Sequence, residues 1–246
     1  MSLRRGNWFV SAAAALGITL GILAWPSLAL AADPQVDDNG AIHMPAYVLP
    51  ESSLLSADAH AVLRHERARV KEYNSHKTCP DEEGADAAHM PAIRKCQAES
   101  FYKTPEYQHL RELYPVQMTP TEIGGIYTEL FVPAEGVAPK NSTRVLINLH
   151  GGGFIGGARY ISHLESVPIA SIGKIKVISI DYRQAPEFRF PAASEDVAAV
   201  YRQLLKTYKP RNIGIYGCSA GGMLTAEVVA WFQRQKLPMP GGDRPT

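Results

Sequence analysis

The six residues Gly217-Cys218-Ser219-Ala220-Gly221-Gly222 decide the fold of this chain. They follow the short apolar run 213–216 and precede a stretch of helical periodicity that extends to about residue 235. A Gly-x-Ser-x-Gly pattern between a strand and a helix is typical of a sharp, strained turn that lifts the serine hydroxyl above the strand end. The helix beneath it presents free N–H groups that favour a developing oxyanion. The pattern therefore predicts Ser219 as a nucleophile. Two alternatives stay open: Ser219 as a helix N-cap, and Cys218 as the nucleophile.

A second glycine-rich segment, His150-Gly151-Gly152-Gly153-Phe154, follows the apolar run 145–149. Its successive glycines expose backbone N–H groups that a tetrahedral intermediate could use. The alternative is a phosphate-binding loop, since Gly151, Gly153 and Gly156 also fit dinucleotide spacing. No Lys-Ser/Thr pair follows, so a P-loop is not expected.

The rest of the chain alternates between strand-like and helix-like stretches. Short apolar runs predict strands at 126–132, 145–149, 177–180 and 213–216, and helical periodicity predicts helices at 54–73, 107–113, 194–208 and 220–235. Residues 33–53 are an expected extended lead-in, and 74–105 are polar and irregular. This order predicts an α/β fold with a doubly wound, mostly parallel sheet.

A third motif, Asp181-Tyr-Arg-Gln-Ala-Pro-Glu187 with Phe190-Pro-Ala192 and Glu195-Asp196, has no chemistry that its spacing alone assigns. Together, the three motifs in this order resemble the hormone-sensitive-lipase-like, or fold-3, family of α/β-hydrolases, over about residues 120–237. The resemblance implies an esterase or lipase that cleaves a small-molecule ester by serine acyl transfer. No His-x-x-x-His, Cys-x-x-Cys or carboxylate cluster suggests a metal, and no cofactor is expected.

The resemblance also implies roles for individual residues. Ser219 matches the nucleophile, and the N–H groups of Gly152, Gly153 and Ala220 match the oxyanion hole. His150 and Gly151 belong to the oxyanion-loop motif, in which the histidine is architectural. The segment 32–120 sits where the family places its cap elements, and Cys218 replaces the family's usual aspartate.

The residues after Ser219 depart from the family pattern. The triad order in this fold is Ser, then Asp or Glu, then His. The 27 residues that follow Ser219 contain no histidine, and their only acids are Glu227 and Asp243. We expect a partial hydrolase domain at 121–246, truncated at its C-terminal side and weak or inactive. Its strand 213–216 would be an exposed edge that could self-associate. The alternative is a non-catalytic remnant or a ligand-binding pseudoenzyme, and an amide or lactone substrate stays open.

The N-terminus resembles an export signal. Arg4 and Arg5 precede a run without charge, which ends in Ala29-Leu30-Ala31. This predicts a signal peptide at 1–31 and a secreted or periplasmic protein without membrane association after cleavage. An uncleaved membrane anchor is the alternative.

Cysteines and charge give two further expectations. Cys79 and Cys96 lie 17 residues apart and could form a disulfide in an oxidising compartment, with two unpaired thiols as the alternative. The 25 basic and 24 acidic residues balance, which excludes a nucleic-acid binder that works through bulk positive charge.

Overall fold

The computed structural model describes residues 35–44, 48, 50–75, 79, 80 and 84–241. The predicted signal peptide therefore lies outside the described residues. The chain divides into two compact units, one up to Glu66 and one from Arg67. The first unit contains a small antiparallel pair, β1 (Gln35–Val36) and β2 (Ile42–His43), and the start of helix α1 (Ala57–Ser75). No helix in the described part is long and apolar enough to cross a membrane.

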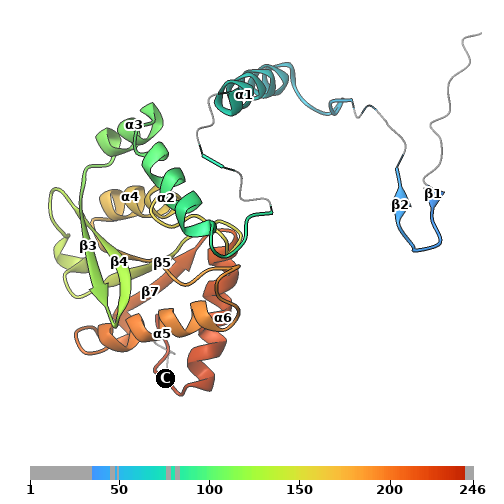
Figure 1. Cartoon of the computed structure of the whole chain (residues 1–246). Helices are drawn as coiled ribbons and strands as arrows, with labels where there is room; N and C mark the ends of the chain where they lie inside the picture. Colours follow the sequence, from blue (N-terminus) through green and yellow to red (C-terminus); the bar gives the residue numbers. More distant parts are fainter. Residues whose placement is uncertain (1–34, 45–47, 49, 76–78, 81–83, 242–246) are drawn as a thin grey trace, which may run out of the picture. The chain divides into compact units, whose positions relative to one another are not determined.

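The second unit is built on a five-stranded sheet of order β3-β4-β6-β5-β7 (Figure 1). The strands are β3 (Val116–Ile123), β4 (Ile126–Pro133), β5 (Val145–Leu149), β6 (Lys176–Ile180) and β7 (Ile213–Gly217). Strands β6, β5 and β7 run parallel, and β3 and β4 add antiparallel pairs. The predicted α/β-hydrolase-type fold is confirmed, with a mixed sheet.

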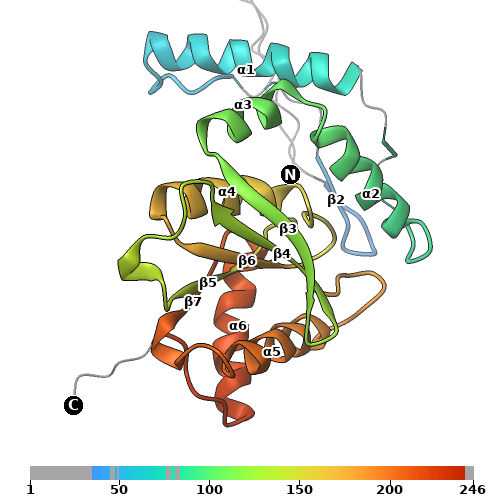
Figure 2. The same ribbon diagram turned by 90° about the vertical axis from the view of Figure 1, so that its left-hand side faces the viewer.

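Helices cover both faces of this sheet (Figure 2). On one face, α4 (Ile161–Gly173) packs Val167 and Ala170 against Phe131 and Val177, and α3 (Pro105–Leu113) lies beside α4. On the other face, α5 (Ala192–Leu204) and α6 (Ala220–Arg234) enclose the main apolar core. Single 3₁₀ turns at Pro139–Asn141 and Pro210–Asn212 precede β5 and β7.

Most predicted elements agree with the structure to within a few residues, but 74–105 is not irregular throughout. Helix α2 (Met90–Phe101) lies inside this segment, begins with a proline in its first turn, and buries Met90, Ile93 and Ala98. These apolar positions are few among polar neighbours, which hides the helical period in the sequence. Strand β3 and helix α4 are also absent from the sequence-based prediction.

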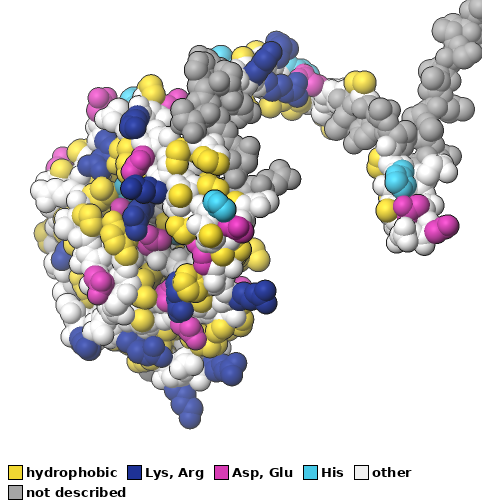
Figure 3. Space-filling model, in the orientation of Figure 1, with side chains coloured by type: hydrophobic (Ala, Val, Ile, Leu, Met, Phe, Trp, Pro, Cys, Tyr) yellow, Lys and Arg dark blue, Asp and Glu magenta, His cyan; other side chains and the backbone are white. Residues whose placement is uncertain are grey.

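The sheet topology brings the three motifs together. Parallel strands present their carboxyl ends at one edge, where α/β proteins place their sites. Leu149 at the end of β5 pairs in register with Gly217 at the end of β7, and β6 ends beside them at Ile180. Among the described strands, β7 pairs only with β5, so it forms an edge of the sheet. On the face drawn in Figure 3, acidic and basic side chains are interspersed.

Candidate active site

Ser219 occupies a strained turn between β7 and α6. Its backbone has φ 52° and ψ −123°, in a region that non-glycine residues rarely adopt. Gly217 and Gly221 flank it, and a Cβ on either one would collide with the main-chain oxygen of Leu149. The Ser219 side chain is exposed and makes no capping hydrogen bond to α6. Ser219 takes the N-cap position of α6 through its backbone, but its side chain does not act as a cap, and the strained turn has the form of a nucleophile elbow.

The loop after β5 lies directly against this turn. A Cβ built on Gly151 would be 3.5 Å from the Cβ of Ser219. Gly152 and Gly153 have positive φ values of 115° and 63°, which a glycine adopts without strain. Within the described part of the chain, the N–H groups of Gly152, Gly153 and Ala220 have no hydrogen-bond acceptor. These three donors therefore lie on the two segments that meet at Ser219.

His150 packs beneath the glycine-rich loop that follows β5 and holds its backbone in place. It is fully buried and stacks on Tyr182, with ring centroids 4.4 Å apart. Its Nδ1 donates to the Gly151 oxygen at 2.8 Å, which leaves Nε2 to accept from the Gln184 amide at 3.2 Å. Burial lowers the pKa of His150 and favours this neutral form. Both ring nitrogens are occupied, so His150 is architectural.

Glu165, on α4, holds the other side of the loop. Its Oε1 accepts the Gly151 N–H at 3.0 Å, and its Oε2 accepts the Asn148 side-chain amide at 2.7 Å. Burial raises the pKa of Glu165, and the two hydrogen bonds oppose that shift. No local sequence pattern predicts a role for this carboxylate.

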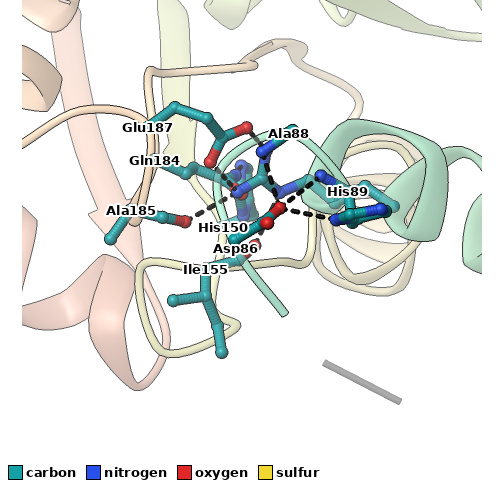
Figure 4. A network of polar contacts seen from close by, with 9 residues as sticks. Asp86, Ala88, His89, His150, Ile155, Gln184, Ala185 and Glu187 are labelled. Carbon is teal, nitrogen blue, oxygen red and sulfur yellow. Dashed lines mark hydrogen bonds and ion pairs between the residues drawn. The ribbon is translucent and has the colours of Figure 1, made fainter. Parts of the chain in front are cut away.

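The third motif ties α2 to the loops around the site. Arg94, on α2, donates to the main-chain oxygens of Ile155 and Ala185 at 2.6 and 2.7 Å, and to both carboxylate oxygens of Glu187 (Figure 4). Figure 4 also shows Gln184 beside His150, and Asp86 bonded to Ala88 and His89 at the start of α2. Arg183 pairs with Asp196 at the start of α5. The residues of the third motif are therefore structural.

Within the described residues, no histidine is hydrogen-bonded to Ser219. His163 is buried and pairs instead with Glu129 and the Tyr107 hydroxyl. His43, His60 and His89 pair with nearby carboxylates, and His76 lies outside the described residues. The site thus contains the strained turn at Ser219 and three N–H groups without an acceptor, and no base lies next to Ser219 in this part of the chain.

The cysteines take two states. Cys79 and Cys96 form a disulfide that joins the segment before α2 to the helix itself. Cys218 is free and exposed beside Ser219.

A mostly apolar cavity of about 340 Å³ opens beside the oxyanion loop. It is lined by Phe154, Phe188, Phe190 and Ala193, with Arg183 and Glu227 among the polar residues at its wall. A second cavity, of about 570 Å³, lies between α2 and the β3–β4 hairpin.

Comparison with known proteins agrees with this geometry. The family model of the alpha/beta hydrolase fold matches residues 146–243. An esterase of the bacterial hormone-sensitive lipase family is 27% identical, with TM-score 0.56, over 76% of this chain and 55% of its own. An esterase/lipase from an uncultured bacterium is 30% identical, with TM-score 0.53, over 71% and 55%. The esterase E25 shares the fold at 24% identity, with TM-score 0.58, over 81% and 58%.

The chain spans slightly more than half the length of these solved esterases. Within that span, all three motifs take up the arrangement described above. Residues 146–243 thus match the alpha/beta hydrolase fold family, and the chain is similar to bacterial esterases of the hormone-sensitive-lipase-like, or fold-3, family.

Proposed function

We propose that this chain carries the nucleophile half of a carboxylic-ester hydrolase site. Ser219 is the nucleophile, and the N–H groups of Gly152, Gly153 and Ala220 form the oxyanion hole. The observation that carries the proposal is the strained φ of Ser219 next to three N–H groups without an acceptor in the described chain. Comparison with solved esterases supports the same reaction class.

The reaction follows from these groups. The Ser219 oxygen attacks the ester carbonyl carbon, its proton passes to a base, and the carbonyl oxygen becomes an oxyanion. The three N–H groups stabilise that charge, and such a donor is worth roughly 10²–10³ in rate. Collapse releases the alcohol and leaves an acyl-serine, which water hydrolyses to the acid. The apolar cavity beside Phe154 would accept a hydrocarbon group of the ester.

Turnover requires a base that the described residues do not place at Ser219. A serine hydroxyl without a base is a poor nucleophile. We propose that the 246-residue chain alone hydrolyses esters slowly, and that the full rate needs an acid and a base from further polypeptide. This agrees with a chain that spans slightly more than half of the related esterases.

The test is hydrolysis of p-nitrophenyl acetate and butyrate by the purified chain. Ser219→Ala should remove whatever hydrolysis the chain shows, whereas Cys218→Ala should retain it and so exclude the rival nucleophile. Equal rates for the parent chain and Ser219→Ala would refute the role of Ser219. Fast turnover that depends on Ser219 would instead refute the need for further polypeptide.

The second candidate function is that of a ligand-binding pseudoenzyme. It is favoured because the described residues place no base at Ser219. Calorimetric binding of a non-hydrolysable ester analogue, with no product from the ester, amide or lactone, would support it over an esterase.

We also propose export of the chain through residues 1–31. The Cys79–Cys96 disulfide supports this, because disulfides persist in oxidising compartments. N-terminal sequencing of the exported protein should begin at Ala32, and a retained N-terminus would contradict cleavage.

The edge strand β7 raises the question of self-association. Unpaired strand edges pair with other chains. Sedimentation velocity over a concentration series should show dimers or larger species if the β7 edge is free, and a monomer at all concentrations would exclude this.

A further inference from the structure

Glu165, which is half-buried, links a buried polar pair to the loop after β5. The Ser179 hydroxyl donates to Asn148 Oδ1 at 2.8 Å, and Asn148 donates to Glu165 Oε2. The other carboxylate oxygen accepts the Gly151 N–H. Asn148 and Ser179 are buried register partners on β5 and β6, so the chain starts from the rigid centre of the sheet.

This carboxylate is also close to the nucleophile. A Cβ on Gly151 would lie 3.4 Å from Glu165 Oε1 and 3.5 Å from the Ser219 Cβ. Glu165 and Ser219 thus both lie next to Gly151. Among the three glycines that follow His150, Gly151 donates its N–H to a side chain. The N–H groups of Gly152 and Gly153 have no acceptor in the described chain.

We propose that Glu165 is a positioning residue for the oxyanion hole. By accepting the Gly151 N–H, it fixes the peptide that leads into Gly152 and Gly153, so that their N–H groups stay available for the oxyanion. This role rests on the proposed esterase function, although the placement of Gly151 can be measured without any turnover.

The hydrogen-bond pattern requires two acceptors on the side chain of Glu165. A carboxylate offers two acceptor oxygens, and both here face N–H donors. In Glu165→Gln, the new NH₂ group faces either the Gly151 N–H or the Asn148 amide for as long as the Ser179 hydroxyl holds Asn148 in its present orientation, which sets donor against donor.

An isosteric swap, Glu165→Gln combined with Asn148→Asp, restores every bond. In this double variant, the amide oxygen introduced on α4 would accept from Gly151, and the amide NH₂ would donate to the carboxylate introduced on β5. The other oxygen of that carboxylate would still accept from the Ser179 hydroxyl. The swap therefore exchanges the acid and the amide without changing the shape or the number of hydrogen bonds.

The experiment is amide hydrogen exchange at Gly151, measured by NMR on the full chain. Exchange in Glu165→Gln should be at least about tenfold faster, and in the swap within about threefold of the parent. Asn148→Asp alone places two carboxylates together and should also lose protection. Glu135→Gln is the matched control, since Glu135 is an exposed carboxylate that pairs with Lys174; it should leave Gly151 unchanged.

Ester hydrolysis provides the second readout. Misplaced oxyanion donors should lower kcat by about 10²-fold in Glu165→Gln with little change in KM, and the swap should recover it. Unchanged Gly151 exchange in Glu165→Gln, or a swap no better than either single variant, overturns the proposal. A parent chain without any hydrolysis counts against the proposed function instead, and the exchange data still decide the placement.

Discussion

The guanidinium of Arg94 bonds to both carboxylate oxygens of Glu187, although the two residues lie 93 positions apart. The pair is mostly buried, with 16% and 15% of the side chains exposed. The same guanidinium donates to the main-chain oxygens of Ile155, in the loop after β5, and of Ala185. One side chain therefore joins α2 to two loops of the hydrolase core.

Removal of Arg94 should destabilise the protein strongly. Arg94→Ala leaves the Glu187 carboxylate without its partner, which costs about 3 kcal/mol for a largely buried pair. Urea unfolding of the second unit is the measurement. Arg94→Lys should recover only part of the loss, because the three donors of an ammonium cannot satisfy all four acceptor oxygens.

The control for Arg94 is Lys174→Ala. Lys174 forms an exposed pair with Glu135, and such surface pairs contribute less than about 1 kcal/mol. Similar losses in Arg94→Ala and Lys174→Ala would show that Arg94 is not a structural tie.

A glycine at position 219 should make the protein more stable than a residue with a side chain does. Its φ and ψ match a position that favours glycine, and holding a side chain there costs about 1–3 kcal/mol. The free energy of unfolding should therefore be about 1 kcal/mol higher for Ser219→Gly than for Ser219→Ala, because alanine keeps the Cβ. Neither variant should hydrolyse esters. Equal stabilities would indicate that the turn is unstrained.

The sequence could predict the sharp turn at Ser219 and the glycine-rich loop after β5 because local chemistry dictates them. Glycines at 217 and 221 are required by the close approach of the Leu149 oxygen, and that requirement is visible as a motif. Glu165 and Arg94 have no such local signal. Their partners lie 14 to 93 residues away, and only the packing of α4 and α2 brings them together.

Helix α2 shows the same limit in the fold. Its buried residues Met90, Ile93 and Ala98 are few, and Arg94, Lys95 and Gln97 lie between the last two, so the sequence pattern is weak. The helix is instead defined by tertiary contacts, among which Arg94 is central.

Neighbouring glycines of α6 should respond very differently to alanine. A Cβ on Gly221 would overlap the Leu149 carbonyl, whereas the nearest atom to a Cβ on Gly222 is the Gly217 oxygen at 3.3 Å. Gly221→Ala should cost about 3 kcal/mol or prevent folding. Gly222→Ala should change the free energy of unfolding by less than about 1 kcal/mol, since alanine also favours the helix. Circular dichroism and urea unfolding will distinguish the two, and equal tolerance would contradict the packing of β5 against α6.

Acidification should affect stability and loop order in opposite directions through Glu165. Burial raises its pKa in the folded protein above the ordinary value of 4.5. The folded state therefore binds the proton more tightly than the unfolded state does. The contribution of Glu165 to the free energy of unfolding is complete below the unfolded pKa, and it is lost as the pH rises through the folded pKa. Tyr182 and Tyr216 face this carboxylate and stay neutral, because burial raises the pKa of both.

The protonated carboxyl has lost one of its two acceptors. The Gly151 N–H should therefore exchange faster at low pH, after correction for intrinsic rates. Over the same pH range, the free energy of unfolding of the parent should increase relative to that of Glu165→Gln. Urea unfolding of both proteins from about pH 4 to 8 gives the first quantity, and NMR exchange gives the second. If the stability difference between the two proteins stays constant above pH 4.5, Glu165 has an ordinary pKa. If the stability difference falls on acidification, the two N–H donors stabilise the carboxylate more than burial destabilises it. The pKa of Glu165 is then lowered in the folded protein, not raised.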